Sequence, residues 1–230
     1  NLTVGRDLKL NGNRITSLPE SFGDLSVGGD LGLHDNRLAS LPDSFSSLKV
    51  GRNLNLGVNN LTSLPDSFSS LEVGGTLDLY LNELTSLPDN FGKLKVGKGL
   101  YLNENQLASL PESFGDLSVG GDLSLEDNRL TLLPDSFGRL SVGGNLDLSK
   151  NNLTSLPENF GSLRVGDNLN LSNNFLSSLP ESFGNLTLGR ELYTENNNWP
   201  YYKIIEYSNK WTGISFNMDE WSISESEDDY

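Results

Sequence analysis

Apolar residues return along this chain at a fixed interval of 23 residues. The period holds from Leu8 to Leu192 without an insertion or deletion, and each copy approximates L-x-L-x-x-N-x-L-x-S-L-P-[D/E]-[S/N]-F-x-x-L-x-V-G-x-x. A fixed period of this length is typical of solenoids, in which each unit buries its apolar face only against its neighbours. The sequence therefore predicts one elongated repeat domain over residues 1–198, with eight full repeats and a partial repeat at each end.

Within one repeat, leucines two residues apart alternate with polar residues, as at Leu31 and Leu33. This alternation predicts a short β-strand with one buried face, and stacked repeats would place such strands parallel and about 4.8 Å apart. The Leu41-Pro42 pair and its counterparts favour extended backbone followed by a turn. The acid and the Phe that come next suit a short 3₁₀ or helical turn, so we expect the phenylalanines to form a spine along the back of the coil.

Asn occupies the sixth position of every repeat, between leucines. We expect these side chains to point inward and to bond to backbone groups of the turn and of the adjacent repeat. An exposed binding column is the alternative. The predicted structural column is Asn13, Asn36, Asn59, Asn82, Asn105, Asn128, Asn151, Asn174 and Asn197.

L-x-L-x-x-N-x-L followed by x-x-L-P-x-x-F-x-x-L resembles the leucine-rich repeat family over residues 1–198. The resemblance implies a leucine-rich-repeat solenoid: a right-handed coil with a parallel β-sheet on its concave face, turns and short 3₁₀ segments on its convex face, and a helical C-terminal cap. Most members carry a leucine where this chain has Gly28 and its counterparts, directly after a Val. The resulting S-V-G-G-D-L sequence is similar to repeats encoded by large DNA viruses and some microbes.

The pattern fails after Leu192, where Thr194 replaces the second strand leucine. A solenoid needs a terminal lid, so we expect residues 199–230 to form an aromatic cap with an acidic tail. An aromatic docking site for a partner is the alternative. The predicted cap residues are Trp199, Trp211 and Trp221.

A helix is expected over Tyr201–Trp211, with Asn197 or Asn198 as its N-cap and Pro200 in its first turn. It should stop at Gly213. Its apolar face would consist of Ile204, Ile205, Tyr207 and Trp211.

The chain is strongly acidic, with 31 Asp and Glu against 16 Lys and Arg in 230 residues, a formal net charge of −15. Nucleic acids and anionic membranes are therefore poor partners, and a basic protein surface is the charge-complementary one. The sequence has no cysteine, which excludes disulfides, cysteine-based zinc sites and thiol nucleophiles. No apolar stretch is long enough to span a membrane and no signal segment opens the chain, so we expect an intracellular protein.

Catalytic chemistry has little support in this sequence. His34 is the only histidine, and no spacing of His, Asp and Glu resembles a metal site. An exposed histidine on a binding face is the favoured interpretation of His34. We therefore expect a protein without enzymatic activity, cofactor or metal.

The columns on and just after the predicted strand differ between repeats, whereas the core columns do not. Val58, Tyr80, Leu81 and Tyr101 would make an apolar and aromatic island on the concave face inside an acidic rim, which is typical of binding patches. Random variation on a solvated face is the alternative. The candidate partner-binding residues are His34, Asn55, Val58, Asp78, Tyr80, Leu81, Tyr101, Asn103, Glu104, Ser124, Glu126, Asp127 and Asp147.

These patterns favour a scaffold that binds a protein partner through its concave face. The alternative is a structural module that associates with itself, because the sequence starts within a repeat at Asn1 and its N-terminal end would be uncapped. The same start is expected if the chain was trimmed or if upstream repeats are missing.

Overall fold

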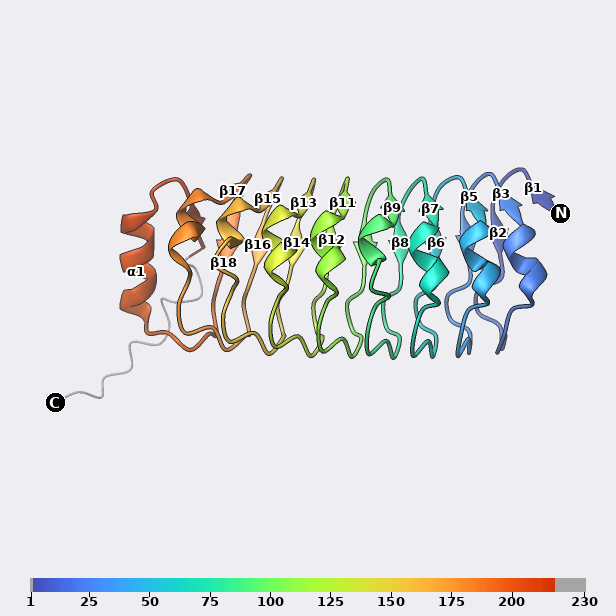
Figure 1. Cartoon of the computed structure of the whole chain (residues 1–230), viewed down its shortest axis with the longest axis horizontal. Coiled ribbons are helices and arrows are strands. Elements are labelled where there is room, and N and C mark those ends of the chain that lie inside the picture. Colours follow the sequence, from blue (N-terminus) through green and yellow to red (C-terminus); the bar gives the residue numbers. More distant parts are fainter. Residues whose placement is uncertain (1, 218–230) are drawn as a thin grey trace.

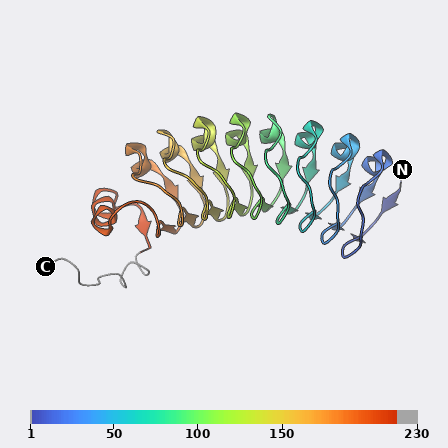
Figure 2. The same cartoon turned by 90° about the horizontal axis from the view of Figure 1, so that it is seen from below.

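The computed structural model describes residues 2–217 as a curved solenoid (Figures 1 and 2). Trp221 of the predicted cap and the acidic tail lie outside these residues. Each repeat contributes one strand to each of two parallel sheets, and a 3₁₀ turn. In Figure 2 the 3₁₀ turns follow the convex edge of the curve.

The predicted sheet is present and contains ten parallel strands, paired in register so that Leu31 lies opposite Leu54 in the next repeat. The inward leucines of this sheet are buried from the second repeat on, as at Leu31 and Leu33. Its strands are β2 (Leu8–Lys9), β4 (Leu31–Gly32), β6 (Leu54–Asn55), β8 (Leu77–Asp78), β10 (Leu100–Tyr101), β12 (Leu123–Ser124), β14 (Leu146–Asp147), β16 (Leu169–Asn170), β18 (Glu191–Tyr193) and β19 (Ser215–Phe216).

A second parallel sheet, of nine two-residue strands, was not predicted. In seven of its strands a buried Val follows a more exposed polar residue, as at Ser26 and Val27. The strands are β1 (Thr3–Val4), β3 (Ser26–Val27), β5 (Lys49–Val50), β7 (Glu72–Val73), β9 (Lys95–Val96), β11 (Ser118–Val119), β13 (Ser141–Val142), β15 (Arg164–Val165) and β17 (Thr187–Leu188).

The second sheet also explains why glycine replaces the usual leucine after this Val. A Cβ on Gly51 would come within 2.4 Å of the carbonyl oxygen of Gly28 in the preceding repeat, and one on Gly74 within 2.3 Å of the oxygen of Gly51. The repeats therefore approach each other too closely at this corner for any side chain.

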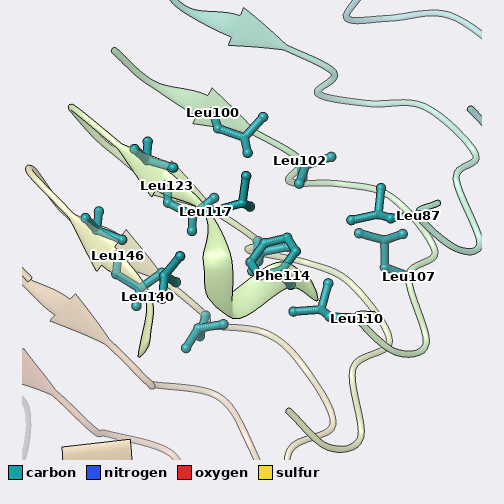
Figure 3. Close-up of a cluster of buried hydrophobic side chains, with 14 of the residues drawn as sticks. Leu87, Leu100, Leu102, Leu107, Leu110, Phe114, Leu117, Leu123, Leu140 and Leu146 are labelled. Atoms are coloured by element: carbon teal, nitrogen blue, oxygen red, sulfur yellow. The ribbon is translucent and has the colours of Figure 1, made fainter. Parts of the chain in front are cut away.

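The 3₁₀ turns begin directly after the prolines in most repeats, because proline at the start has no N–H to leave unpaired. The turns from η2 to η8 each bury a phenylalanine, whereas Phe22 in η1 is partly buried. Most neighbouring rings stack, with centroids 6.0 Å apart for Phe91 and Phe114. Figure 3 shows Phe114 among leucines of its own and neighbouring repeats. The turns are η1 (Glu20–Asp24), η2 (Asp43–Ser47), η3 (Asp66–Ser70), η4 (Phe91–Lys93), η5 (Glu112–Asp116), η6 (Asp135–Arg139), η7 (Phe160–Ser162) and η8 (Glu181–Asn185).

The asparagine column lies inside the coil and joins successive repeats. The Asn59 amide donates to the carbonyl oxygens of Leu33 and Leu56, at 3.1 and 3.0 Å, and its oxygen accepts the Leu38 N–H at 3.0 Å. The same bonds recur along the column up to Asn197. Asn13 in the first repeat is exposed, and its amide bonds within its own repeat.

Helix α1 (Tyr201–Lys210) covers the last repeat. Pro200 is its N-cap and no side chain caps it, so the expected asparagine cap is wrong: Asn197 already belongs to the asparagine column. The helix ends at Lys210 and not at Gly213, and Ile205 of the expected apolar face is 40% exposed.

The buried side of α1 continues the phenylalanine spine. Trp211 lies 5.6 Å from Phe183 and 4.8 Å from Tyr207, centroid to centroid, and Trp199 is buried beside Tyr207. The Tyr207 hydroxyl accepts the buried Leu179 N–H at 3.1 Å. After the helix, β19 pairs with β18 and extends the ten-stranded sheet.

Candidate partner-binding face

The candidate residues gather on the outer face of the ten-stranded sheet. Strand pairing places Asp78 opposite Asn55 on one side and Tyr101 on the other, and Ser124 next to Tyr101. These four side chains are all partly buried. Asp147 follows Ser124 on the next strand, so one row of the face crosses five repeats.

The residue three positions after each of these strands is held in the left-handed backbone region. Val58 and Leu81 have φ angles of 53° and 51°, and the other side chains in this column have nearly the same value. Glycine, asparagine and aspartate tolerate this conformation, whereas a β-branched valine is a strained outlier there. The column is Gly12, Asp35, Val58, Leu81, Glu104, Asp127, Lys150, Asn173 and Asn196.

The residues of this column vary between repeats, and that variation hides the constraint that the left-handed backbone places on them. The available signal was its composition, since five of the nine residues are Gly, Asp or Asn. Val58 and Leu81 therefore occupy their positions against the preference of the backbone. Leu81 is 39% exposed, so burial in the folded chain compensates little of that cost.

Several side chains of the row bond to their own strand. The side-chain oxygen Oδ1 accepts the N–H two residues later, at 2.9 Å from Asn55 to Gly57, 3.0 Å from Asp78 to Tyr80 and 2.8 Å from Asp147 to Ser149. Part of this variable row thus stabilises the strand ends, which the sequence comparison of repeats did not reveal.

The electrostatics of the row centre on Asp78 and Tyr101. Burial raises the pKa of the Asp78 carboxyl, against the opposite effects of the Tyr80 N–H and of His34. Burial also raises the pKa of Tyr101, and the carboxylate of Asp122 raises it further. The Tyr101 ring lies over Gly99, and its hydroxyl is 3.5 Å from Oδ2 of Asp122.

The remaining candidates are spread around this centre. Glu104 and Asp127 are exposed, and Asn103 is partly buried. Glu126 forms an ion pair with Lys150 at 2.8 Å, a pairing that the predicted rim did not include. His34 is partly buried, and its Nδ1 has no hydrogen-bond partner among residues 2–217.

The acids that follow each proline lie on the convex side, and two of them, Glu20 and Glu112, bond through their carboxylates to the next repeat. Oε2 of Glu20 accepts the Ser44 N–H at 3.2 Å, and the Ser44 hydroxyl donates to the Glu20 carbonyl oxygen. Across residues 2–217, no group of three His, Asp or Glu side chains is placed to hold a metal ion.

A groove of about 1140 Å³ lies over the second sheet, away from the predicted face. It is lined by side chains that alternate in charge, including Lys49, Glu72 and Lys95, and by Gly51 and Gly74. Lys95 forms an ion pair with Glu72. Sequence analysis missed this groove because the second sheet itself was missed.

Comparison with known proteins supports the repeat family. The Leucine Rich Repeat family model matches residues 145–163 and 167–186. No curated protein sequence matches the chain. Among solved structures, a chain of the Toll–Spätzle complex of Drosophila is 27% identical with a TM-score of 0.60, over 88% of this chain and 28% of that chain.

Two bacterial structures are also similar. A Shigella effector LRR domain is 23% identical with a TM-score of 0.57, over 93% of this chain and 82% of that chain. YopM from Yersinia enterocolitica is 26% identical with a TM-score of 0.52, over 84% of this chain and 42% of that chain. The chain thus spans less than half of YopM and less than a third of the Toll-complex chain. The resemblance to viral repeats stays a prediction.

No helix within residues 2–217 is long and apolar enough to cross a membrane. The predicted intracellular location stays a prediction.

Proposed function

Because the chain is a leucine-rich-repeat solenoid, a fold that in general serves as a protein-interaction scaffold, we propose that it binds a protein partner without catalysing a reaction. The proposed site is the outer face of the ten-stranded sheet around Val58, Tyr80, Leu81 and Tyr101. Spätzle is the partner named for the Toll complex, so a similar repeat array occurs in a protein complex. Fold similarity alone is a general argument, and the site has to be argued from its own residues.

One observation carries this proposal: two neighbouring repeats place apolar residues at a backbone position that disfavours them. Val58 and Leu81 both have φ near 50°, where a side chain other than Gly, Asn or Asp costs about 1–2 kcal/mol. Glu104 and Lys150 bear the same cost in other repeats, and Val58 and Leu81 are the two apolar residues among the four. Such strain is tolerated where a function depends on the residue. Tyr80 precedes Leu81 on the same strand end, so the two strained residues adjoin an aromatic ring.

The charge around this island supports a basic partner surface. Asp78, Glu104 and Asp127 surround the island, and the whole chain carries a net charge of −15. Opposite charge on a partner would speed its association and fix its orientation.

A comparison of two double variants tests the site. The wild-type chain, Tyr80→Ala/Tyr101→Ala and Leu132→Ser/Phe175→Asn would each be immobilised and exposed to lysate. Leu132 and Phe175 are 58% and 51% exposed elsewhere on the coil, and other repeats carry Ser and Asn in those columns. We expect the same protein to be retained by the wild type and the control and lost from the tyrosine variant. Equal retention by all three chains would place the site elsewhere.

Self-association through the N-terminal end is the second candidate. Leu8, Leu10 and Phe22 are only partly buried in the first repeat, whereas their counterparts in later repeats are buried. Leu2 is 66% exposed beside them. Light scattering over a concentration series tests this candidate: a mass that rises with concentration and falls again in Leu2→Asp would support it, and a constant monomer mass would not.

A further inference from the structure

The carboxylate of Asp78 is the central charged group of the proposed face. It is partly buried, and its Oδ1 accepts the Tyr80 N–H at 3.0 Å. In the part of the chain that the structure describes, no hydrogen bond reaches Oδ2 and no Lys or Arg pairs with Asp78. Other acids do find cations: Glu126 pairs with Lys150 and Asp7 with Arg52.

Gly57 of the preceding repeat contributes no side chain next to this carboxylate. A Cβ on Gly57 would be 3.4 Å from Oδ1 of Asp78 and 3.2 Å from Oδ1 of Asn55. Gly57 is outside the left-handed region, and every other repeat has a side chain in this column, among them His34 and Tyr80. The backbone therefore does not require glycine here, and its absent side chain leaves this side of Asp78 free of contact from that column.

Two tyrosines lie next to Asp78 along the chain and across the sheet. Tyr80 follows two residues after Asp78, just beyond β8, and Tyr101 lies opposite Asp78 on β10, with its hydroxyl directed to Asp122. A carboxylate that loses its remaining water in a complex is costly unless a cation replaces that water. A guanidinium suits this place because it is weakly hydrated, bonds carboxylates through a planar fork and stacks on aromatic rings, whereas an ammonium is strongly hydrated.

Resting on the proposed function, we propose that the protein partner inserts an arginine side chain at Asp78. The guanidinium donates to Oδ2 of Asp78 and lies against the ring of Tyr80, with Tyr101 beside it. Val58 and Leu81 then contact apolar groups next to that arginine.

A library of random peptides displayed on phage is the probe for this inference. The library would be selected on the immobilised whole chain and depleted on Tyr80→Ala/Tyr101→Ala, which leaves peptides that need the tyrosines. We expect an arginine to be common to these peptides. In one selected synthetic peptide, Arg→Lys should weaken binding about tenfold or more, because a stacked and bidentate arginine is not replaced by lysine.

The matched substitutions in the chain are Asp78→Asn and Asp24→Asn, and both remove one charge. Asp78→Asn keeps the turn, since Asn55 makes the same bond to Gly57 N–H at 2.9 Å. Asp24 is exposed on the convex side, in a column where the last repeat carries Asn185. Asp78→Asn should weaken the peptide about tenfold or more, and Asp24→Asn should leave it within about twofold. Thermal unfolding of both variants checks that the fold is intact.

The outcomes separate the inference from the proposed function. Peptides that need Tyr80 and Tyr101 but lack a shared arginine, prefer lysine or are unaffected by Asp78→Asn would overturn the arginine inference and leave the binding face in place. If no peptide needs the tyrosines, both the face and the inference are wrong.

Discussion

The left-handed residue that lies three positions after each strand from β2 to β18 in the ten-stranded sheet links local backbone energetics to function. Asn173 and Asn196 adopt the left-handed conformation at low energetic cost, because the short side chain of Asn is able to form a local hydrogen bond there. Val58 cannot, because its branched Cβ crowds the following carbonyl group. The two kinds of residue should therefore differ in their effect on the free energy of unfolding, which is measurable without any partner.

Val58→Asn should stabilise the protein and weaken partner binding. Relief of the left-handed strain at φ 53° should raise the free energy of unfolding by about 1 kcal/mol. The reverse change, Asn173→Val, should lower it by a similar amount and leave binding unchanged. Urea unfolding of both variants with unchanged slope measures the effect. A neutral or destabilising Val58→Asn would show that valine is not strained and would remove the main support for the proposed site.

The strands of the ten-stranded sheet could be predicted from their repeated pattern of leucines. The two-residue strands of the second sheet could not be predicted, because they show no such pattern. The strand of Leu31 and Leu33 was predicted because its leucines alternate and recur. A strand of two residues, such as Ser26–Val27, is too short to show a period. Gly28, which departs from the usual leucine, permits the close approach of the repeats in this sheet. On the face, strand register was predictable, but the bond from Tyr80 N–H to Asp78 was not, because it depends on a side-chain rotamer.

The asparagine column is an element shared by all repeats, and its inner members should matter more than its first. Asn105→Ala removes the acceptor of the Leu84 N–H and the donor to the carbonyl oxygens of Leu79 and Leu102. These groups become buried without partners, so we expect a loss of about 3 kcal/mol. Asn13→Ala, at the exposed end, should cost at most about 0.5 kcal/mol. Similar losses from both variants in equilibrium unfolding would contradict the structural role of the column.

The cap element should protect the C-terminal repeats. Trp211→Ala removes a buried ring between Phe183 and Tyr207, which should cost about 3–5 kcal/mol. Because each repeat contacts only its neighbours, the loss should speed amide hydrogen exchange near Phe183 more than near Leu100. Ile205→Ser, on the exposed side of α1, is the control and should change neither rate. Uniform acceleration along the coil would mean that the repeats unfold as one unit.

The whole molecule combines a neighbour-to-neighbour core with a large excess of negative charge. Its repeats differ little inside, so stability is spread along the coil, and no Asp, Glu, Lys or Arg is buried within residues 2–217. The sequence as a whole has a net charge of −15. Charge of one sign repels itself within the fold and attracts an oppositely charged partner. Both effects act over distances that salt shortens, to a Debye length of about 8 Å at physiological ionic strength.

Salt should therefore change stability and partner association in opposite directions. Raising sodium chloride from low to physiological concentration should raise the midpoint of thermal unfolding, because it screens repulsion among the acidic side chains. The same change should slow association with a basic partner, measured by stopped flow, while dissociation changes less. Potassium chloride is the control and should act equally, since screening does not depend on the cation. An association rate that ignores salt would show that the apolar island recruits the partner without help from the acidic rim.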